Sequence, residues 1–323
     1  MTSRHAPDRF SGLAPRPLRR VLAGVALDGS DGRVLAAASS ICAATGAQLT
    51  IVHASEPVES ALLLAMADEQ PVDGQAKLAS KVERCLPHRV QHSLEVLPGP
   101  AHRVIGEVAA RTSPDLILIG ASAHESTLLG STAERVVRKA TVPVLVVHGQ
   151  LAAPARRVIA PVDLSQLSAS GFHSGLAMAS RLAGGAQLQV VSLFAIGYLD
   201  AMSTEMRERR WTEDEMTARA RQRLDELVQR HLPEVELVCE SRVVLGPARE
   251  SILGAAKADD PELIVMSTHG YGGFERLVLG SVAATVVREA PCSVLLVPPE
   301  GAFSDEIAEA VLSQTAPWKT VSV

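Results

Sequence analysis

Short apolar runs alternate along this chain with longer stretches in which apolar residues recur every three or four positions. The pattern is clearest near the carboxyl end, where the apolar run 263–266 leads into a loop that contains three glycines. Apolar residues then recur at helical spacing from Val282 to Val287, and a second apolar run follows at 293–297. Such runs are typical of buried parallel strands, and such recurrence is typical of amphipathic helices. The sequence therefore predicts a strand, a glycine loop, a helix and a strand, in that order.

The same alternation extends over most of the chain. Further strands are predicted at 21–27, 49–54, 90–97, 116–119, 142–147, 158–162 and 188–193. Helices are predicted from 34 to 46, within 56–85, from 99 onward and over 211–232. In the last of these the apolar positions lie on one face, so we interpret its many charges as a solvated surface.

Several short segments occur twice in the same order. The pairs are RRVL at 19–22 with RRVI at 156–159, GPA at 99–101 with GPA at 246–248, PDLI at 114–117 with PELI at 261–264, and GS at 130–131 with GS at 280–281. Repetition at this interval indicates a duplicated folding unit and has to be settled before the fold is assigned.

Two copies of an alternating strand–helix unit predict two tandem doubly wound α/β domains of Rossmann-like type. Each is expected to have a mostly parallel, five-stranded sheet. The predicted units are a disordered leader at 1–17, a first domain at 18–150, a second domain at 154–298 and a tail at 299–323. Ligands of such sheets bind beyond the carboxyl ends of the strands, where the strand order reverses.

Composition narrows the possible functions. The 323 residues carry 31 Lys and Arg against 36 Asp and Glu, a net charge of −5, and only 3% are aromatic. That balance argues against a nucleic-acid-binding surface. No apolar run has membrane-spanning length, and the first 20 residues lack the hydrophobic segment of a signal peptide. The four cysteines form no C-x-x-C pair, so we interpret them as reduced core thiols of a cytoplasmic protein.

The glycine loop has the features of a phosphate site. Glycines allow a backbone to approach a ligand, and a helix N-terminus offers unpaired N–H groups with a partial positive charge. The spacing Ser267-x2-Gly270-x9-Gly280-Ser281 resembles the nucleotide motif Gly-x2-Gly-x9-Gly-[Ser/Thr] of the universal stress protein family. Ser267 in place of the first glycine is the one departure. The resemblance extends over residues 18–298.

The resemblance implies both a function and a set of contacts. The implied function is binding of ATP, with Mg²⁺ as a possible companion, by a cytoplasmic protein that regulates or scaffolds a stress response without catalysis. Asp163 is assigned to the base or ribose, although the bare sequence leaves open that Asp163 or Ser165 caps the next helix. The implied nucleotide contacts are Pro161, Val162, Asp163, Leu193, Met266, Ser267, Gly270, Gly280, Ser281 and Val282, with Gly130 and Ser131 in the first copy.

The first copy departs further from the motif. Gly120 keeps the first glycine, Ala123 replaces the second, and six residues instead of nine precede the final Gly-Ser. An ungapped count places Ala26 opposite Asp163, whereas a gap would place Asp28 there. We therefore expect adenine nucleotide in the second domain and a weak or empty site in the first.

Several alternatives stay open. Residues 120–124 miss the last glycine of a nucleophile elbow, and Cys85, His88 and His92 lack a second pair of metal ligands. A slow ATPase, an adenylate-transferring enzyme and a nucleotide-free interaction module are the rival functions. The last strands of the two copies would otherwise leave sheet edges open. By resemblance to the family we expect them to pair within the chain, and two chains to form a homodimer.

Overall fold

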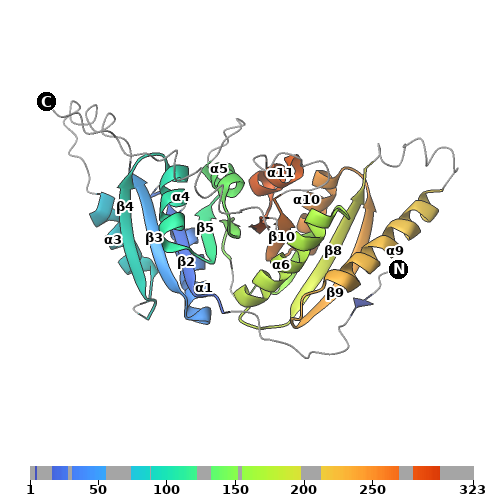
Figure 1. The fold of residues 1–323 in the computed structure, drawn as a ribbon, viewed down its shortest axis with the longest axis horizontal. Coiled ribbons are helices and arrows are strands. Elements are labelled where there is room, and N and C mark those ends of the chain that lie inside the picture. The colour runs from blue at the N-terminus through green and yellow to red at the C-terminus, as the bar shows by residue number, and fades with distance from the viewer. Residues whose placement is uncertain are drawn as a thin grey trace.

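The computed structural model contains one continuous sheet of eleven strands (Figure 1). The first half contributes β2 (Arg20–Val25), β3 (Gln48–Ser55), β4 (His92–Pro98), β5 (Leu116–Gly120) and β6 (Val144–Val147). The second half contributes β7 (Arg157–Pro161), β8 (Leu188–Ile196), β9 (Leu237–Leu245), β10 (Leu263–Ser267) and β11 (Ser293–Val297), and β1 (Arg4–His5) precedes them all. The structure describes residues 4–5, 17–27, 31–55, 74–87, 89–121, 132–151, 155–197, 212–268 and 279–298.

Within each half the strands are parallel and follow the same order. That order is β4-β3-β2-β5-β6 in the first half and β9-β8-β7-β10-β11 in the second. The predicted pair of doubly wound, mostly parallel five-stranded sheets is therefore confirmed. The strand order reverses between β2 and β5 and between β7 and β10, which marks the two places where a ligand site is expected.

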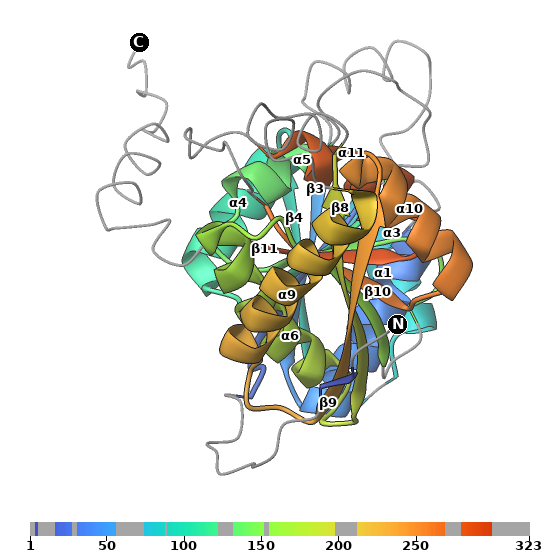
Figure 2. The same cartoon turned by 90° about the vertical axis from the view of Figure 1, so that its right-hand side faces the viewer.

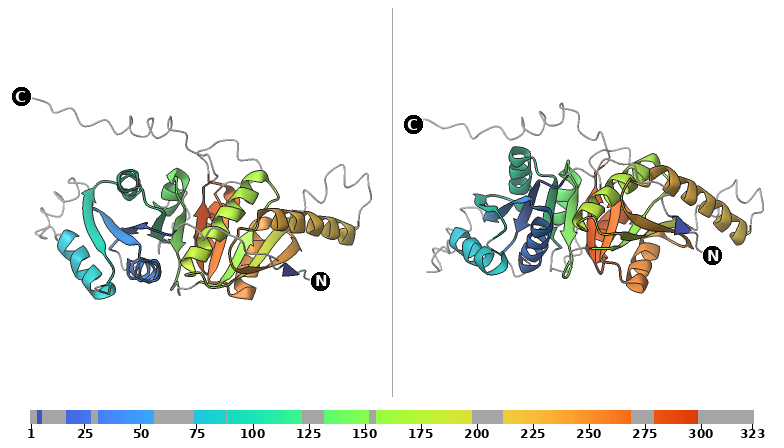
Figure 3. Two further views of the ribbon diagram at one scale, coloured as in Figure 1. Left: turned by 60° about the horizontal axis from the view of Figure 1, so that its bottom comes forward. Right: turned by 90° about the horizontal axis from the view of Figure 1, so that it is seen from below.

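Eight helices among the described residues cover both faces of the sheet (Figure 3). One face carries α1 (Asp31–Thr45), α3 (Gly74–Cys85), α6 (Gln166–Leu182) and α9 (Glu213–His231). The other carries α4 (Ala101–Thr112), α5 (Thr132–Lys139), α10 (Ala248–Asp259) and α11 (Ser281–Glu289). In the second half, α6 and α9 lie on one side of β8 and β9, with α10 on the other (Figure 2). Among the described helices, none is both long and apolar enough to cross a membrane.

The last strands of the two halves pair with each other in antiparallel fashion. Leu145 of β6 lies opposite Leu295 of β11, which confirms the expected pairing within the chain. Beside this ladder, His148 Nε2 donates to Val287 O at 2.8 Å, and the Ser293 hydroxyl donates to His148 O at 3.2 Å. Because β6 and β11 run in opposite directions, the carboxyl ends of the parallel strands lie at opposite edges of the sheet in the two halves.

The start of the chain reaches the far edge of the second half (Figure 1). β1 pairs antiparallel with β9, with Arg4 opposite Glu240 and His5 opposite Cys239. Within the predicted disordered leader, residues 4–5 are thus an ordered strand. Most of the remaining leader and all of the tail at 299–323 lie outside the described residues.

Matching backbone contacts fix how the two halves correspond. The N–H of Arg20 donates to Asp115 Oδ2 at 2.9 Å, and the N–H of Arg157 donates to Glu262 Oε2 at 2.8 Å. In each half, the acidic residue before the fourth strand therefore holds the start of the first strand. Arg20 corresponds to Arg157, as the repeated segments predict.

Candidate functional site

Strands β7 and β10 are paired only near their starts. Their ladder ends after the pair Ile159–Ile264, whereas β10 stays paired with β11 to its last residue. Pro161 explains the difference. Val162 N–H donates to Leu193 O on β8 at 2.9 Å, and successive residues of a strand point to opposite edges. The nitrogen of Pro161 therefore faces β10 and has no hydrogen to donate.

Asp163 lies just beyond β7 in a tight turn. Its Oδ1 accepts the N–H of Ser165 at 3.0 Å, and its own N–H donates to Ser168 Oγ at 3.2 Å. Ser165 is the N-cap of α6, and its hydroxyl accepts the N–H of Ser168 at 3.1 Å. The capping role thus belongs to Ser165. The half-buried Asp163 is held separately at the carboxyl end of β7.

Ser267, the last residue of β10, packs directly against α6. A Cβ atom built on Gly171 would lie 2.5 Å from Ser267 Cβ, well inside the carbon–carbon contact distance of about 3.5–4.0 Å. One turn further along α6, a Cβ on Gly175 would lie 2.4 Å from Val265 Cγ1. Two glycines on one face therefore allow α6 to approach β10 closely. The serine that departs from the glycine motif fits because a glycine stands opposite it.

The N-terminus of α11 lies beyond the carboxyl end of β10. Gly280 is its N-cap and supplies no side-chain cap. The N–H of Gly280 donates to Thr268 O at 3.0 Å, and a Cβ on Gly280 would lie 3.4 Å from that oxygen. The first N–H groups of a helix have no acceptor within it. The donors at this end are therefore the N–H groups of Ser281, Val282 and Ala283, and not that of Gly280.

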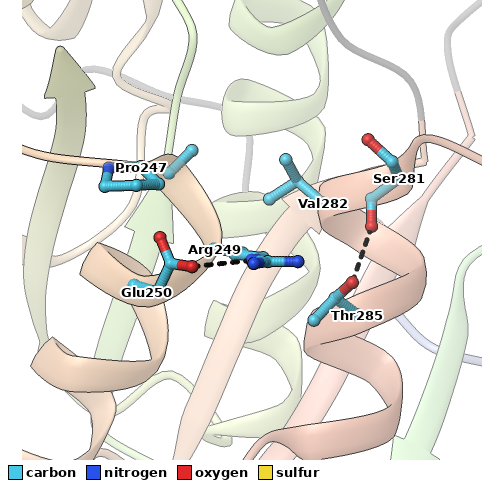
Figure 4. Close-up of a pocket in the computed structure, with 7 residues that line it drawn as sticks. Pro247, Arg249, Glu250, Ser281, Val282 and Thr285 are labelled. Carbon is cyan, nitrogen blue, oxygen red and sulfur yellow. Dashed lines mark hydrogen bonds and ion pairs between the residues drawn. The ribbon is translucent and has the colours of Figure 1, made fainter. Parts of the chain in front are cut away.

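A groove with a volume of about 300 Å³ runs between the first turns of α10 and α11 (Figure 4). Inside it, Arg249 Nε lies 2.8 Å from Glu250 Oε1, and the Thr285 hydroxyl donates to Ser281 O at 3.0 Å. The lining residues are Pro247, Ala248, Arg249, Glu250, Ser281, Val282 and Thr285.

Both helices that border this groove begin without a side-chain cap. The N-cap of α10 is Pro247, and that of α11 is Gly280. In contrast, α6 and α9 on the opposite face are capped by the hydroxyls of Ser165 and Thr212. The uncapped N–H groups and the positive ends of two helix dipoles therefore meet at one groove.

The structure brings together part of the predicted contact set. Ser281 and Val282 line the groove, while Val162, Leu193 and Met266 are buried beneath the carboxyl ends of the central strands. Three predicted contacts lie outside the described residues, namely Gly270, Gly130 and Ser131. The sequence pattern did not single out Arg249, Glu250 and Thr285. The repeated GPA segment was the available signal, because it marks where α10 starts.

Comparison with known proteins identifies the family. A family model described as the universal stress protein family matches residues 17–148 and 154–298. The chain belongs to the universal stress protein family. We refer to its two matched segments as the first and second universal stress domains.

Individual relatives match parts of the chain. A universal stress protein of Thermus aquaticus is 47% identical over 58 residues, which is 18% of this chain and 42% of that protein. One of Mycolicibacterium smegmatis is 30% identical over 200 residues, 59% of this chain and 64% of that protein. The solved structure of a functionally unknown Pseudomonas aeruginosa protein has a TM-score of 0.63 at 19% identity and covers 92% of this chain and 98% of its own. That structure supports the fold alone.

In the first universal stress domain, the central strands β2 and β5 stay paired at the position where β7 and β10 of the second domain separate. β2 and β5 stay paired as far as Gly24–Ile119. Gly24 corresponds to Pro161, and a Cβ on Gly24 would lie 2.7 Å from Ile105 Cδ1. The side chain of Ile105 therefore fills the space beside the end of β2.

The first domain also lacks the carboxylate at this strand end. Counted without a gap from the arginine contacts, Ala26 corresponds to Asp163. The next residues, Leu27 and Leu164, both have a left-handed backbone, with φ of 61° and 62°. This shared turn supports the ungapped correspondence, which leaves an alanine where the second domain has an acid.

The four cysteines are free thiols. Burial raises the pKa of Cys42, Cys239 and Cys292 to about 12, so these three sulfurs stay protonated near neutral pH. Among the described residues, no group of three or more His, Cys, Asp or Glu side chains is placed to hold a metal ion.

Proposed function

We propose that the second universal stress domain binds an adenine nucleotide, ATP, with its phosphates at the start of α11. The observation that carries the proposal is the groove at which two uncapped helix N-termini meet. Uncapped first turns attract anions through their N–H donors and the helix dipole. The nucleotide motif of the family ends at the same place, at Gly280 and Ser281.

Each proposed contact has a chemical role. Ser281 offers its N–H and hydroxyl to a phosphate, and Val282 offers its N–H. Asp163 accepts a hydrogen bond from the ribose or from the adenine amino group. The backbone of Leu193 and the side chain of Met266 border the base, and Gly270 lets the loop approach the phosphates. Mg²⁺ is expected to enter with the triphosphate rather than at a protein site of its own.

We propose binding for regulation or scaffolding in a stress response rather than catalysis. Hydrolysis requires a group that positions or deprotonates the attacking water. Among the described residues, Glu250 is the one acid that lines the groove, and it is paired with Arg249. Steady-state phosphate release by the purified protein tests this point. Phosphate release faster than that of ATP without the protein would favour the slow-ATPase alternative.

Calorimetric titration of the full chain with ATP, in the presence and absence of Mg²⁺, tests the site. Hydrogen bonds to charged groups contribute about 1.5–3 kcal/mol, so Ser281→Ala should weaken binding roughly tenfold or more. Gly280→Val should weaken it further, because the branched side chain occupies the space of the phosphate. Ser93→Ala, an exposed serine on β4, is the matched control. Wild-type affinity in both site variants would refute the assignment.

We further propose one tight nucleotide per chain and a homodimeric assembly in the cytoplasm. The first domain has Ala26 in place of the acid, and its central strands β2 and β5 stay paired where β7 and β10 separate. The same titration should therefore give a stoichiometry near one. β6 and β11 are already used within the chain, so a second copy has to bind through another surface. Light scattering at micromolar concentration should report twice the chain mass. A monomer would refute the dimer.

A further inference from the structure

The surface of the first domain that matches the groove carries a different set of charges. The pairs Ile117–Val144 and Ile264–Val294 align the strands that flank α5 and α11, and GPA segments align α4 with α10. The corresponding residues are Arg249 and His102, Glu250 and Arg103, Thr285 and Arg135, and Glu289 and Lys139. The paired or neutral positions of the second domain are therefore replaced by potential cations in the first.

The cations of the two domains also differ in their partners. In the second domain, Arg249 is paired with Glu250 at 2.8 Å, and Arg288 with Glu289 at 3.2 Å. In the first domain, the side chains of four exposed cations have no ion-pair or hydrogen-bond partner in the part of the chain that the structure describes. These four are Arg103, Arg135, Arg138 and Lys139.

The charges of all four cations act on one histidine. Burial and then the charges of Arg135, Lys139, Arg103 and Arg138 lower the pKa of His102. The acid in the first turn of α5, Glu134, lies 3.7 Å from Arg288 of the second domain. Positive charge from two helices, α4 and α5, therefore acts at the start of α4.

An ordinary structural role accounts for only part of this cluster. Arg138 and Lys139 are in the last turn of α5, where cations stabilise the negative end of a helix dipole. Arg103 and Arg135 are in the first turns of α4 and α5, where a positive charge opposes the dipole. A bound anion would offset this unfavourable interaction with the two dipoles.

We propose that the surface between α4 and α5 binds a chain of phosphate groups through Arg103 and Arg135. The N-terminus of α4 adds N–H donors, because its N-cap is Pro100 and supplies no side-chain cap. Among the described residues of the first domain, the carboxylate proposed to bind the base has no counterpart, because Ala26 replaces the acid. The ligand is therefore recognised by its phosphates alone. This site goes beyond the nucleotide site proposed for the second domain.

The test exchanges the charges of the two domains. Inorganic tripolyphosphate is titrated calorimetrically into the full chain carrying Gly280→Val, which disables the proposed nucleotide site. Arg103→Glu with Arg135→Thr gives the first domain the residues of the second and should weaken binding at least a hundredfold, about tenfold for each arginine. Lys257→Gln, on α10 and away from this surface, is the control and should bind as the background does.

Two sources of the phosphate chain are separated by a second titration with ATP in the same background. Equal affinity for ATP and tripolyphosphate identifies any triphosphate as a ligand and would overturn the expected stoichiometry of one ATP per chain. Preference for tripolyphosphate identifies inorganic polyphosphate and leaves that stoichiometry in place. Both results support the proposal if the double variant loses the binding. No saturable binding of either compound up to millimolar concentration overturns it, as does a folded double variant that binds with unchanged affinity. Circular dichroism melting establishes that the exposed substitutions leave the fold intact.

Discussion

The contact between Gly171 and Ser267 makes a sharp prediction about packing behind the proposed site. Gly171→Ala adds one methyl group at a position where its carbon would lie 2.5 Å from Ser267 Cβ and 3.1 Å from Ser267 Cα. A relaxed carbon contact is about 3.5–4.0 Å, so the methyl overlaps the serine by about 1 Å. One of the two atoms involved belongs to the backbone of β10, so a rotamer change cannot relieve the whole clash.

The size of the effect follows from two opposing terms. An added methyl in a packed interior costs about 1–3 kcal/mol. Alanine is favoured over glycine in a helix by about 0.5–1 kcal/mol. We therefore expect Gly171→Ala to lower the free energy of unfolding by about 1–2 kcal/mol. Adding Ser267→Gly should restore most of that loss, because it removes the atom that clashes.

Urea unfolding followed by circular dichroism measures all three variants and the wild type. The matched control is Gly254→Ala in α10, where an added Cβ meets nothing within 4 Å. The control should gain about 0.5–1 kcal/mol from helix propensity alone. A coupling energy of about 1 kcal/mol between positions 171 and 267 is expected from the double-mutant cycle. A stable Gly171→Ala variant, or one that Ser267→Gly fails to rescue, would refute the packing argument.

Two further predictions concern titratable groups. Burial lowers the pKa of His148 at the β6–β11 junction, with a smaller raising effect from its bond to Val287 O. As the pH is lowered, the unfolded chain therefore takes up the proton before the folded chain does, and the free energy of unfolding falls below about pH 6.5. His148→Gln should reduce this fall, measured by thermal unfolding between pH 7.5 and 5.5. Ellman's reagent at pH 8 should modify the native protein slowly at Cys42, Cys239 and Cys292, whose pKa values are raised to about 12. Rapid reaction of all four thiols with the reagent before denaturation would contradict the burial of these three.

The apolar pattern predicts the individual strands and helices, because each of them is one continuous segment whose apolar residues pack in the core of the sheet and its helices. The prediction at 188–193 matches the start of β8 (Leu188–Ile196), and the prediction at 211–232 contains α9 (Glu213–His231). The repeat predicts the common strand order, since identical units fold alike. The site at the start of α11 follows from the same reasoning, because strand, glycine loop and helix are consecutive in the chain.

The apolar pattern could not predict contacts between segments that are far apart in the sequence. Gly171 and Ser267 are far apart in sequence, and neither residue signals the other. Asp31 is the first residue of α1, and it is buried with Oδ2 2.8 Å from Lys81 Nζ of α3. In the sequence, Pro161 is an ordinary end of a strand. Only the structure shows that its nitrogen, which has no hydrogen, faces β10. Each of these features depends on which element packs beside which, and tertiary packing decides that.

The differences between the two domains are concentrated at one place in the fold. Four pairs of corresponding residues at the carboxyl ends of the central strands and the helix behind them have changed together, namely Pro161 and Gly24, Asp163 and Ala26, Gly171 and Val34, and Ser267 and Gly120. In the last two pairs the larger residue has moved from the helix to the strand, so the total volume is nearly kept. The cores and the strand order remain alike. A duplicated unit that keeps its packing but changes its strand ends retains the fold and presents different groups at those ends. The antiparallel junction also places these ends at opposite edges of the sheet, so the two proposed sites do not overlap.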